Sequence, residues 1–170
     1  KRLQMKKYDL KTFFNKIEYD WEKDIQPLRE ICKLTKTRAR KETKQFEFTY
    51  GIEQTFLIKA ILENQKAENF FEIGTGRGTA CYAASLITTI KNILTVDIVP
   101  FNHKIMTAIN HRAAHVSNED LYNMIPYEEK SKICFIERGS MAKYLADLDH
   151  KFDVCFIDGN HTNMDIIIED

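Results

Sequence analysis

Three glycines at alternate positions separate a short apolar run from a helical pattern. Gly74, Gly76 and Gly78 follow the apolar residues 70–73 and precede a helical segment that begins at Thr79. Glycine allows a tight turn to bring its backbone close to a ligand, because it has no side chain in the way. A strand, a glycine-rich turn and a helix in this order are typical of cofactor sites on parallel sheets. The turn therefore predicts an α/β fold with a ligand site after its first strand.

Four short runs, almost continuous in apolar residues, predict strands that are buried on both faces: residues 70–73, 93–99, 133–137 and 152–158. Helical patterns lie before and between these runs, at residues 54–65, 79–90, 104–115, 118–124 and 141–148. Alternating strands and helices predict a doubly wound, mostly parallel, Rossmann-like sheet. Ser117 is expected to mark the start of the helix at 118–124. The sequence ends at Asp170, so we expect a fragment whose sheet is truncated after the fourth strand and whose C-terminal part is missing.

Residues 1–45 are expected to form an N-terminal helical segment and a linker, ahead of a cofactor-binding domain at 46–170. Apolar residues recur at three-to-four spacing over about residues 8–35, and Pro27 is expected to divide this segment into two helices. Residues 33–44 are basic and polar without periodicity, which indicates a linker. The N-terminal helices are expected to cover an acceptor site or to form a homodimer.

The composition is that of an ordinary soluble globular protein, with 170 residues, of which 44% are hydrophobic and 29% are charged. No stretch approaches the roughly 20 apolar residues of a membrane-spanning helix, and the N-terminus does not resemble a secretory signal. The four cysteines form no CxxC pair, which fits a reducing compartment and predicts a cytoplasmic location. A formal net charge of zero argues against a globally basic nucleic-acid binder.

One basic stretch leaves an RNA substrate open as an alternative. The basic residues of 33–44 are followed by Phe46, Phe48 and Tyr50, and such mixtures of basic and aromatic residues bind single-stranded nucleic acid. The same aromatic residues alternate with polar ones as in an edge strand, and charged runs are usually solvated linkers. Nucleic acid is therefore the less favoured partner, behind a small-molecule acceptor.

The residues around the turn favour one cofactor over another. Glu72 precedes the first glycine, and the spacing is GxGxG rather than the GxGxxG of dinucleotide sites. A dinucleotide needs backbone amides for its pyrophosphate. S-adenosylmethionine has no phosphate and carries a sulfonium and an ammonium cation, which a carboxylate suits. A glycine turn that binds no ligand and only packs a helix on the sheet is the alternative.

The segment from Glu72 to Gly78 resembles the first motif of the class I S-adenosylmethionine-dependent methyltransferases. That motif has the form (Asp/Glu)-x-Gly-x-Gly-x-Gly, and the match is complete at every defined position. The resemblance implies that Gly74, Thr75, Gly76 and Gly78 cradle the cofactor. It also implies that Glu72 faces the ammonium side.

Two further strand ends supply candidate cofactor contacts. Asp97 ends the second apolar run, where a carboxylate can accept both ribose hydroxyls of an adenosine, although a solvated loop acid is the alternative. The third run leads to Ser140, where the family often carries a Gly-Asp-Ser-like sequence near the adenine. This chain has no Asp there, so Ser140 is a candidate either for an adenine contact or for a helix cap.

The fourth run ends in Asp158-Gly159-Asn160-His161. This strand end resembles a subgroup that includes methyltransferase family 24, cephalosporin-hydroxylase-like proteins and macrolide sugar O-methyltransferases. The resemblance implies that Asp158 is a catalytic residue that binds Mg²⁺ or the cofactor, and that His161 is the general base for methyl transfer to a sugar or small-molecule hydroxyl. Further carboxylates of such a metal site would follow Asp170. Alternatively, Asp158 touches only the cofactor amine and His161 caps the next helix.

Two functions from other classes stay open beside the methyltransferase. A nicotinamide-dependent oxidoreductase would use the same turn and Asp97, and a non-catalytic module would bind the cofactor without turnover. His111 and His115 have a spacing that can bind metal on a helix, but a solvated helix face is favoured for them.

Overall fold

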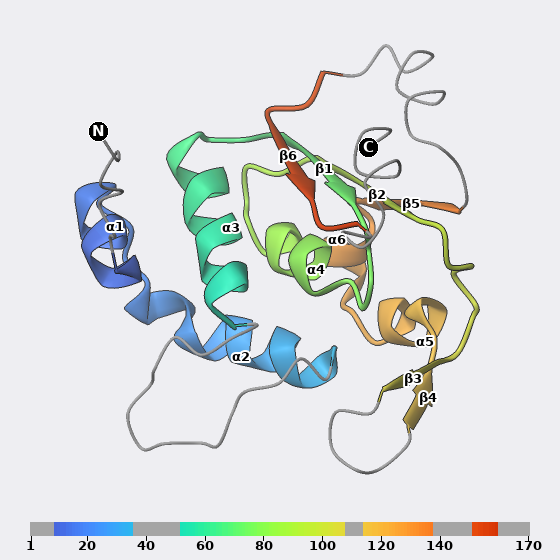
Figure 1. The fold of residues 1–170 in the computed structure, drawn as a ribbon. Helices are drawn as coiled ribbons and strands as arrows, with labels where there is room; N and C mark the ends of the chain where they lie inside the picture. The colour runs from blue at the N-terminus through green and yellow to red at the C-terminus, as the bar shows by residue number, and fades with distance from the viewer. Residues whose placement is uncertain (1–8, 36–51, 108–113, 138–150, 160–170) are drawn as a thin grey trace, which may run out of the picture.

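The protein is described by a computed structural model that covers residues 9–35, 52–107, 114–137 and 151–159. Its centre is a four-stranded parallel sheet with the strand order β5-β2-β1-β6 (Figure 1). The strands are β1 (Asn69–Ile73), β2 (Asn92–Asp97), β5 (Ile133–Glu137) and β6 (Val154–Ile157). All four predicted strands are therefore present, and the Rossmann-like α/β class is confirmed.

The central strands are more deeply buried than the outer ones. Phe71 in β1 and Ile93 in β2 are buried, whereas Cys134 in β5 is exposed and Ile157 in β6 is 52% exposed. Among the described residues, β5 and β6 each pair with one strand only. The prediction of burial on both faces is thus right for β1 and β2 and wrong for β5 and β6.

The helices α3 (Ile52–Asn64) and α4 (Thr79–Ser85) pack against each other and cover one face of the sheet. Leu62 of α3 and Ala84 of α4 share a hydrophobic cluster with Phe70 of the sheet. Burial of such side chains supplies most of the stability of the layer, at roughly 1.5–3 kcal/mol for a large one. The predicted helix at 79–90 ends early, at Ser85, but Ile87 and Ile90 stay buried, which explains why the apolar pattern continued beyond the helix.

The N-terminal segment contains α1 (Leu10–Lys16), the 3-10 helix η1 (Glu22–Asp24) and α2 (Ile25–Leu34). The break falls after α1, where Glu18 has a positive φ of 55°. Pro27 lies in the first turn of α2, where its missing N–H has no helical partner to lose. The prediction that Pro27 divides the helices is therefore wrong.

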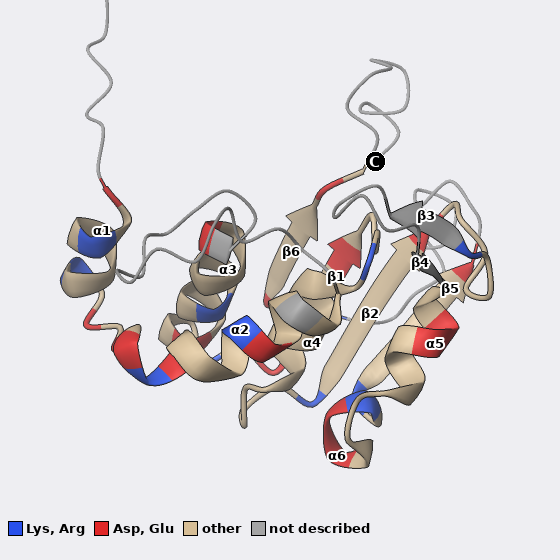
Figure 2. Ribbon diagram, turned by 90° about the horizontal axis from the view of Figure 1, so that it is seen from below, with Lys and Arg blue, Asp and Glu red and all other residues tan. Residues whose placement is uncertain are grey.

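The N-terminal helices share a core with the helices of the sheet domain. Phe14 and Leu28 cluster with Phe56 of α3 and Ala83 of α4. In Figure 2, α2 runs across α4 while α1 lies on the outer side, next to α3. The predicted domain boundary at 45/46 lies outside the described residues. No helix in the described part of the chain combines the length and the apolar character needed to cross a membrane.

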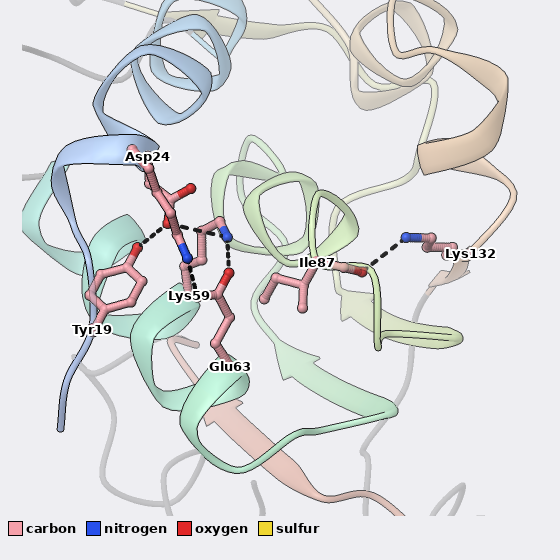
Figure 3. Close-up of polar contacts among 7 residues, drawn as sticks. Tyr19, Asp24, Lys59, Glu63, Ile87 and Lys132 are labelled. Carbon is pink, nitrogen blue, oxygen red and sulfur yellow. Dashed lines mark hydrogen bonds and ion pairs between the residues drawn. The ribbon is translucent and has the colours of Figure 1, made fainter.

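A buried ion network fixes η1 to α3 (Figure 3). Lys59 of α3 lies 3.3 Å from the Asp24 carboxylate, and both side chains are less than 10% exposed, at 6% and 8%. The Tyr19 hydroxyl donates to Asp24 at 2.6 Å, and Lys59 also pairs with Glu63. Charges buried in this way are costly unless they are paired, so the network holds the two segments in one arrangement.

The segment after β2 differs from its prediction. Residues 104–115 were expected to form a helix, but their described parts form an antiparallel pair of strands, β3 (Ile105–Thr107) and β4 (Ala114–Val116). The β-branched residues Ile105, Thr107 and Val116 favour extended backbone, which the helical pattern did not take into account. His111 lies outside the described residues, so its metal-binding alternative stays untested.

Two short helices follow β4: α5 (Asn118–Asn123) and α6 (Tyr127–Lys130). Ser117 starts α5 with a capping box, in which the Asp120 N–H donates to the Ser117 hydroxyl at 3.1 Å and the Asp120 carboxylate accepts from the Ser117 N–H at 2.9 Å. The predicted helix at 118–124 is confirmed. The predicted helix at 141–148 lies outside the described residues.

Candidate functional site

The glycine turn folds back onto the end of β2. Gly74 and Thr75 donate their backbone N–H groups to the Val96 carbonyl at 2.8 and 3.2 Å, and Gly78 donates to the Thr75 carbonyl at 2.7 Å. All three glycines have positive φ angles: 89° at Gly74, 52° at Gly76 and 75° at Gly78. Residues with a Cβ rarely adopt this conformation, so the sequence pattern is explained by the backbone alone.

The three glycines differ in what surrounds them. A Cβ on Gly74 would overlap the Asp158 carbonyl, and one on Gly78 would overlap the Tyr82 ring. A Cβ on Gly76 would meet no atom of the described residues within 4 Å. The outer glycines therefore allow the turn to pack against the end of β6 and against α4, while the middle glycine borders open space that a ligand could enter.

Asp97 is fixed at the end of β2 by two backbone donors. The Gly76 N–H donates to one carboxylate oxygen at 2.8 Å, and the Val99 N–H donates to the other at 2.9 Å. Each carboxylate oxygen can accept a second hydrogen bond. Ile98, the next residue, is 71% exposed. Asp97, the predicted contact to the ribose, is thus held in place beside Gly76. The apolar side chain of Ile98 lies next to it in the sequence.

Four backbone amides of the turn are engaged within the protein. The N–H groups of Gly74, Thr75, Gly76 and Gly78 each donate to an acceptor of the protein. The acceptor for Gly76 is a carboxylate, which would repel a phosphate placed there. A pyrophosphate would need these donors, so the geometry suits a cofactor without phosphate better than a dinucleotide.

Glu72 lies inside the protein, with 1% of its surface exposed. The Thr95 hydroxyl donates to its carboxyl at 2.6 Å, and the Thr75 and Thr95 hydroxyl oxygens are also 2.6 Å apart. Burial raises the pKa of Glu72 to about 8, although hydrogen bonds from Thr95 and Cys81 oppose this rise. The predicted contact between Glu72 and the cofactor ammonium stays a prediction.

Asp158 follows β6 directly and lies next to the turn. Its N–H donates to the Ile73 carbonyl at 2.8 Å, and the Gln54 side-chain amide donates to its carboxylate at 3.2 Å. His161, the predicted general base, and Ser140, the candidate adenine contact, lie outside the described residues. Within the described ranges, no three His, Cys, Asp or Glu side chains gather where they could hold a metal ion. The described residues therefore do not form a Mg²⁺ site around Asp158.

Asp97 and Asp158 act electrostatically on the buried Glu72 at this edge of the sheet. Asp97 and Asp158 both raise the pKa of Glu72 by charge repulsion, so their fields reach its buried carboxyl. Arg77, half-buried within the turn, contributes a positive charge. The two carboxylates at the ends of β2 and β6, half-buried at Asp97 and exposed at Asp158, would suit a cationic ligand.

One hollow among the described residues lies elsewhere on the sheet. It has a volume of about 660 Å³ and is lined by the amino ends of the strands, including Asn69, Asn92 and Lys132. None of the predicted site residues lines it. The hollow therefore does not include the candidate site, which lies at the carboxyl ends of the strands.

Comparison with known proteins supports the fold. No protein-family model and no curated protein matches the sequence. The SAH-bound methyltransferase PaMTH1 of Podospora anserina is 17% identical and has a TM-score of 0.56, over 98% of this chain and 66% of that one. This chain has a methyltransferase fold. The methyltransferase domain of bacterial CtHen1-CN is also similar, with 15% identity and a TM-score of 0.47, over 68% of this chain. The chain spans 66% and 55% of the lengths of these two proteins.

Three residues of the site were missed by the sequence analysis. Thr95 is a polar residue inside an apolar strand. Because a buried hydroxyl needs a hydrogen-bond partner, its position in the sequence could have indicated a contact with a neighbouring polar residue. Gln54 and Asn118 lie near the starts of α3 and α5, and the Asn118 amide donates to the Gly76 carbonyl at 2.9 Å. Helices that run antiparallel to their neighbouring strands begin at the carboxyl edge of the sheet, so this topology places residues such as Gln54 and Asn118 near the turn.

Proposed function

We propose that the chain is the cofactor-binding part of an S-adenosylmethionine-dependent methyltransferase. The observation that carries the proposal is the hydrogen bond from the Gly76 N–H to the Asp97 carboxylate. This bond places a negative charge at the point of the turn where a dinucleotide would place its pyrophosphate. The same carboxylate can still accept ribose hydroxyls, and the fold similarity to an SAH-bound methyltransferase supports the choice.

The described residues fit such a cofactor. Asp97 would hold the ribose, and the exposed Ile98 would offer an apolar surface to the adenine. Asp158 would attract the ammonium group, with Gln54 orienting its carboxylate. The open space beside Gly76 would leave room for the sugar. When bound, S-adenosylmethionine supplies a methyl group on a sulfonium.

The proposed acceptor is a hydroxyl of a sugar or another small molecule, as the strand end at Asp158 to His161 implies. His161 would accept the hydroxyl proton while the oxygen bonds to the methyl carbon, and the electron pair of the broken bond would stay on sulfur. Because the described residues do not form a Mg²⁺ site, no step of this reaction is assigned to a metal ion. An RNA acceptor and a homodimer stay predictions from the sequence.

Isothermal titration of the full-length protein with S-adenosylmethionine, S-adenosylhomocysteine (SAH) and NADH tests the proposal. We expect the first two to bind, and we expect Asp97→Ala to weaken both by at least about tenfold, or roughly 1.4 kcal/mol, because it removes the ribose acceptor. Asp20→Ala, which removes an exposed carboxylate far from the turn, serves as the matched control and should bind normally. Binding of NADH alone, or of none of the three, would contradict the proposal, whereas binding of the first two without methyl transfer to any acceptor would favour a non-catalytic module.

A further inference from the structure

A chain of three oxygens connects a buried acid to the glycine turn. The carboxyl of Glu72, the hydroxyl of Thr95 and the hydroxyl of Thr75 follow one another at 2.6 Å per step. Their residues are 1%, 1% and 5% exposed. Thr75 belongs to the turn itself, between Gly74 and Gly76. A change in the protonation of Glu72 can therefore affect Thr75 in the turn directly through these hydrogen bonds, without an intervening water.

The direction of the hydrogen bonds depends on the proton of Glu72. An ionised Glu72 can only accept, so Thr95 donates to it and Thr75 donates to Thr95. A protonated Glu72 can donate to Thr95, and Thr95 can then donate to Thr75. In the first state the Thr75 hydroxyl can only accept hydrogen bonds from other groups. In the second state its hydrogen is no longer donated to Thr95, so it can be donated to another group. The proton on Glu72 thus reverses the polarity of Thr75.

The described groups that act on the Glu72 carboxyl do not favour its ionised form by charge. Cys81 and Tyr82 face it from α4, and Asp97 and Asp158 act on it from the ends of β2 and β6. Among the described groups that shift the pKa of Glu72, none is a cation. This environment and the burial raise the pKa of Glu72 to about 8, which favours the protonated carboxyl at neutral pH.

We propose that Glu72 is the proton-exchanging group of this site: it carries a proton when the turn is empty and releases that proton to solvent when a sulfonium lies over the turn. Thr95 and Thr75 transmit the change to the turn as a reversal of hydrogen-bond direction. This inference rests on the proposed function. When methyl transfer removes the sulfonium charge, Glu72 takes a proton back from solvent, so the site distinguishes the charged cofactor from its neutral thioether product.

Calorimetric titration in two buffers of different ionisation enthalpy counts the protons released on binding. Near pH 8 we expect S-adenosylmethionine to release a fraction of a proton per site and SAH to release much less. Glu72→Gln keeps the size and a hydrogen-bonding side chain but cannot titrate, so it should bind both ligands with no difference in proton release. Equal release by the two ligands in the natural protein, or unchanged release in Glu72→Gln, would overturn the inference.

A second pair of variants tests the relay while Glu72 stays in place. Thr95→Val removes the hydroxyl that stabilises the carboxylate, so proton release should move to higher pH, and Thr95→Ser should restore the natural profile. If proton release in Thr95→Val depended on pH as it does in the natural protein, the role of Thr95 and Thr75 in transmitting the change would be contradicted. The two proposals fail in different ways, because absence of any binding contradicts the cofactor assignment, whereas binding without proton release contradicts only the role of Glu72.

Discussion

At the scale of single residues, Asp97 and Gly76 act as one unit. The carboxylate holds the Gly76 N–H, and the Asn118 amide holds the Gly76 carbonyl, so the peptide groups on both sides of this glycine are fixed before a ligand arrives. Preorganisation of this kind lowers the cost of ordering a loop on binding. The sequence predicted Asp97 and Gly76 as contacts of the cofactor, but their mutual bond required the structure.

Gly76→Ala should mainly weaken ligand binding, whereas Gly74→Ala should mainly lower the stability of the fold. Gly76→Ala should cost only about 1–2 kcal/mol of stability, from its left-handed φ, because its Cβ meets no atom of the residues that the structure describes. It should nevertheless weaken SAH binding strongly, since the Cβ enters the proposed ligand space. Gly74→Ala should destabilise the fold much more, because its Cβ overlaps the Asp158 carbonyl. Urea unfolding and calorimetry measure the two effects, and equal losses of stability would contradict this difference between the glycines.

Glu72 should make the stability of the protein depend on pH. Its pKa is raised by burial from 4.5 to about 8, so the folded state keeps a proton that the unfolded state releases. The stabilisation is complete below about pH 4.5 and is lost as the pH rises through about 8, by a few kcal/mol at most. Glu72→Gln should flatten this fall in urea-unfolding experiments, whereas the exposed Glu68→Gln should not. If the free energy of unfolding of Glu72→Gln fell with pH as steeply as that of the natural protein, this would argue against a buried protonated carboxyl.

At the scale of elements, the predictions succeeded where pattern and burial agreed. The four apolar runs became the strands, and Ser117 began α5 as predicted. The helix predicted at 104–115 was wrong because a helical spacing of apolar residues competed with the extended preference of β-branched ones. Pro27 was assigned to a break, but a first helical turn tolerates proline equally well.

Lys59 ties the N-terminal helices to α3, and its loss should show in the free energy of unfolding. Lys59→Ala would leave Asp24 buried without its cation, so we expect a loss of about 3–5 kcal/mol. Lys91→Ala is the matched control, because the pair between Lys91 and Glu68 is exposed and should contribute at most about 1 kcal/mol. Urea unfolding of both variants gives the comparison. Equal losses would show that the buried network does not hold the segments together.

At the scale of the whole molecule, the sequence predicted the sheet and the edge at which the site lies. This was possible because the glycine turn and the acids at Asp97 and Asp158 all follow apolar runs, and the carboxyl ends of parallel strands meet at one edge. The packing of α2 and α3 around this edge depends on contacts between distant segments, such as the Thr79 hydroxyl donating to the Thr35 hydroxyl at 2.9 Å. Local patterns contain no information on such contacts.

A crystal structure of the full-length protein grown with SAH tests the central claim most directly. The account predicts that both ribose hydroxyls lie within about 2.7–3.2 Å of the Asp97 carboxylate, with the sugar beside Gly76 and the bond from Gly76 to Asp97 intact. SAH bound in the hollow at the amino ends of the strands, or a turn that releases Asp97 to bind a phosphate, would contradict it.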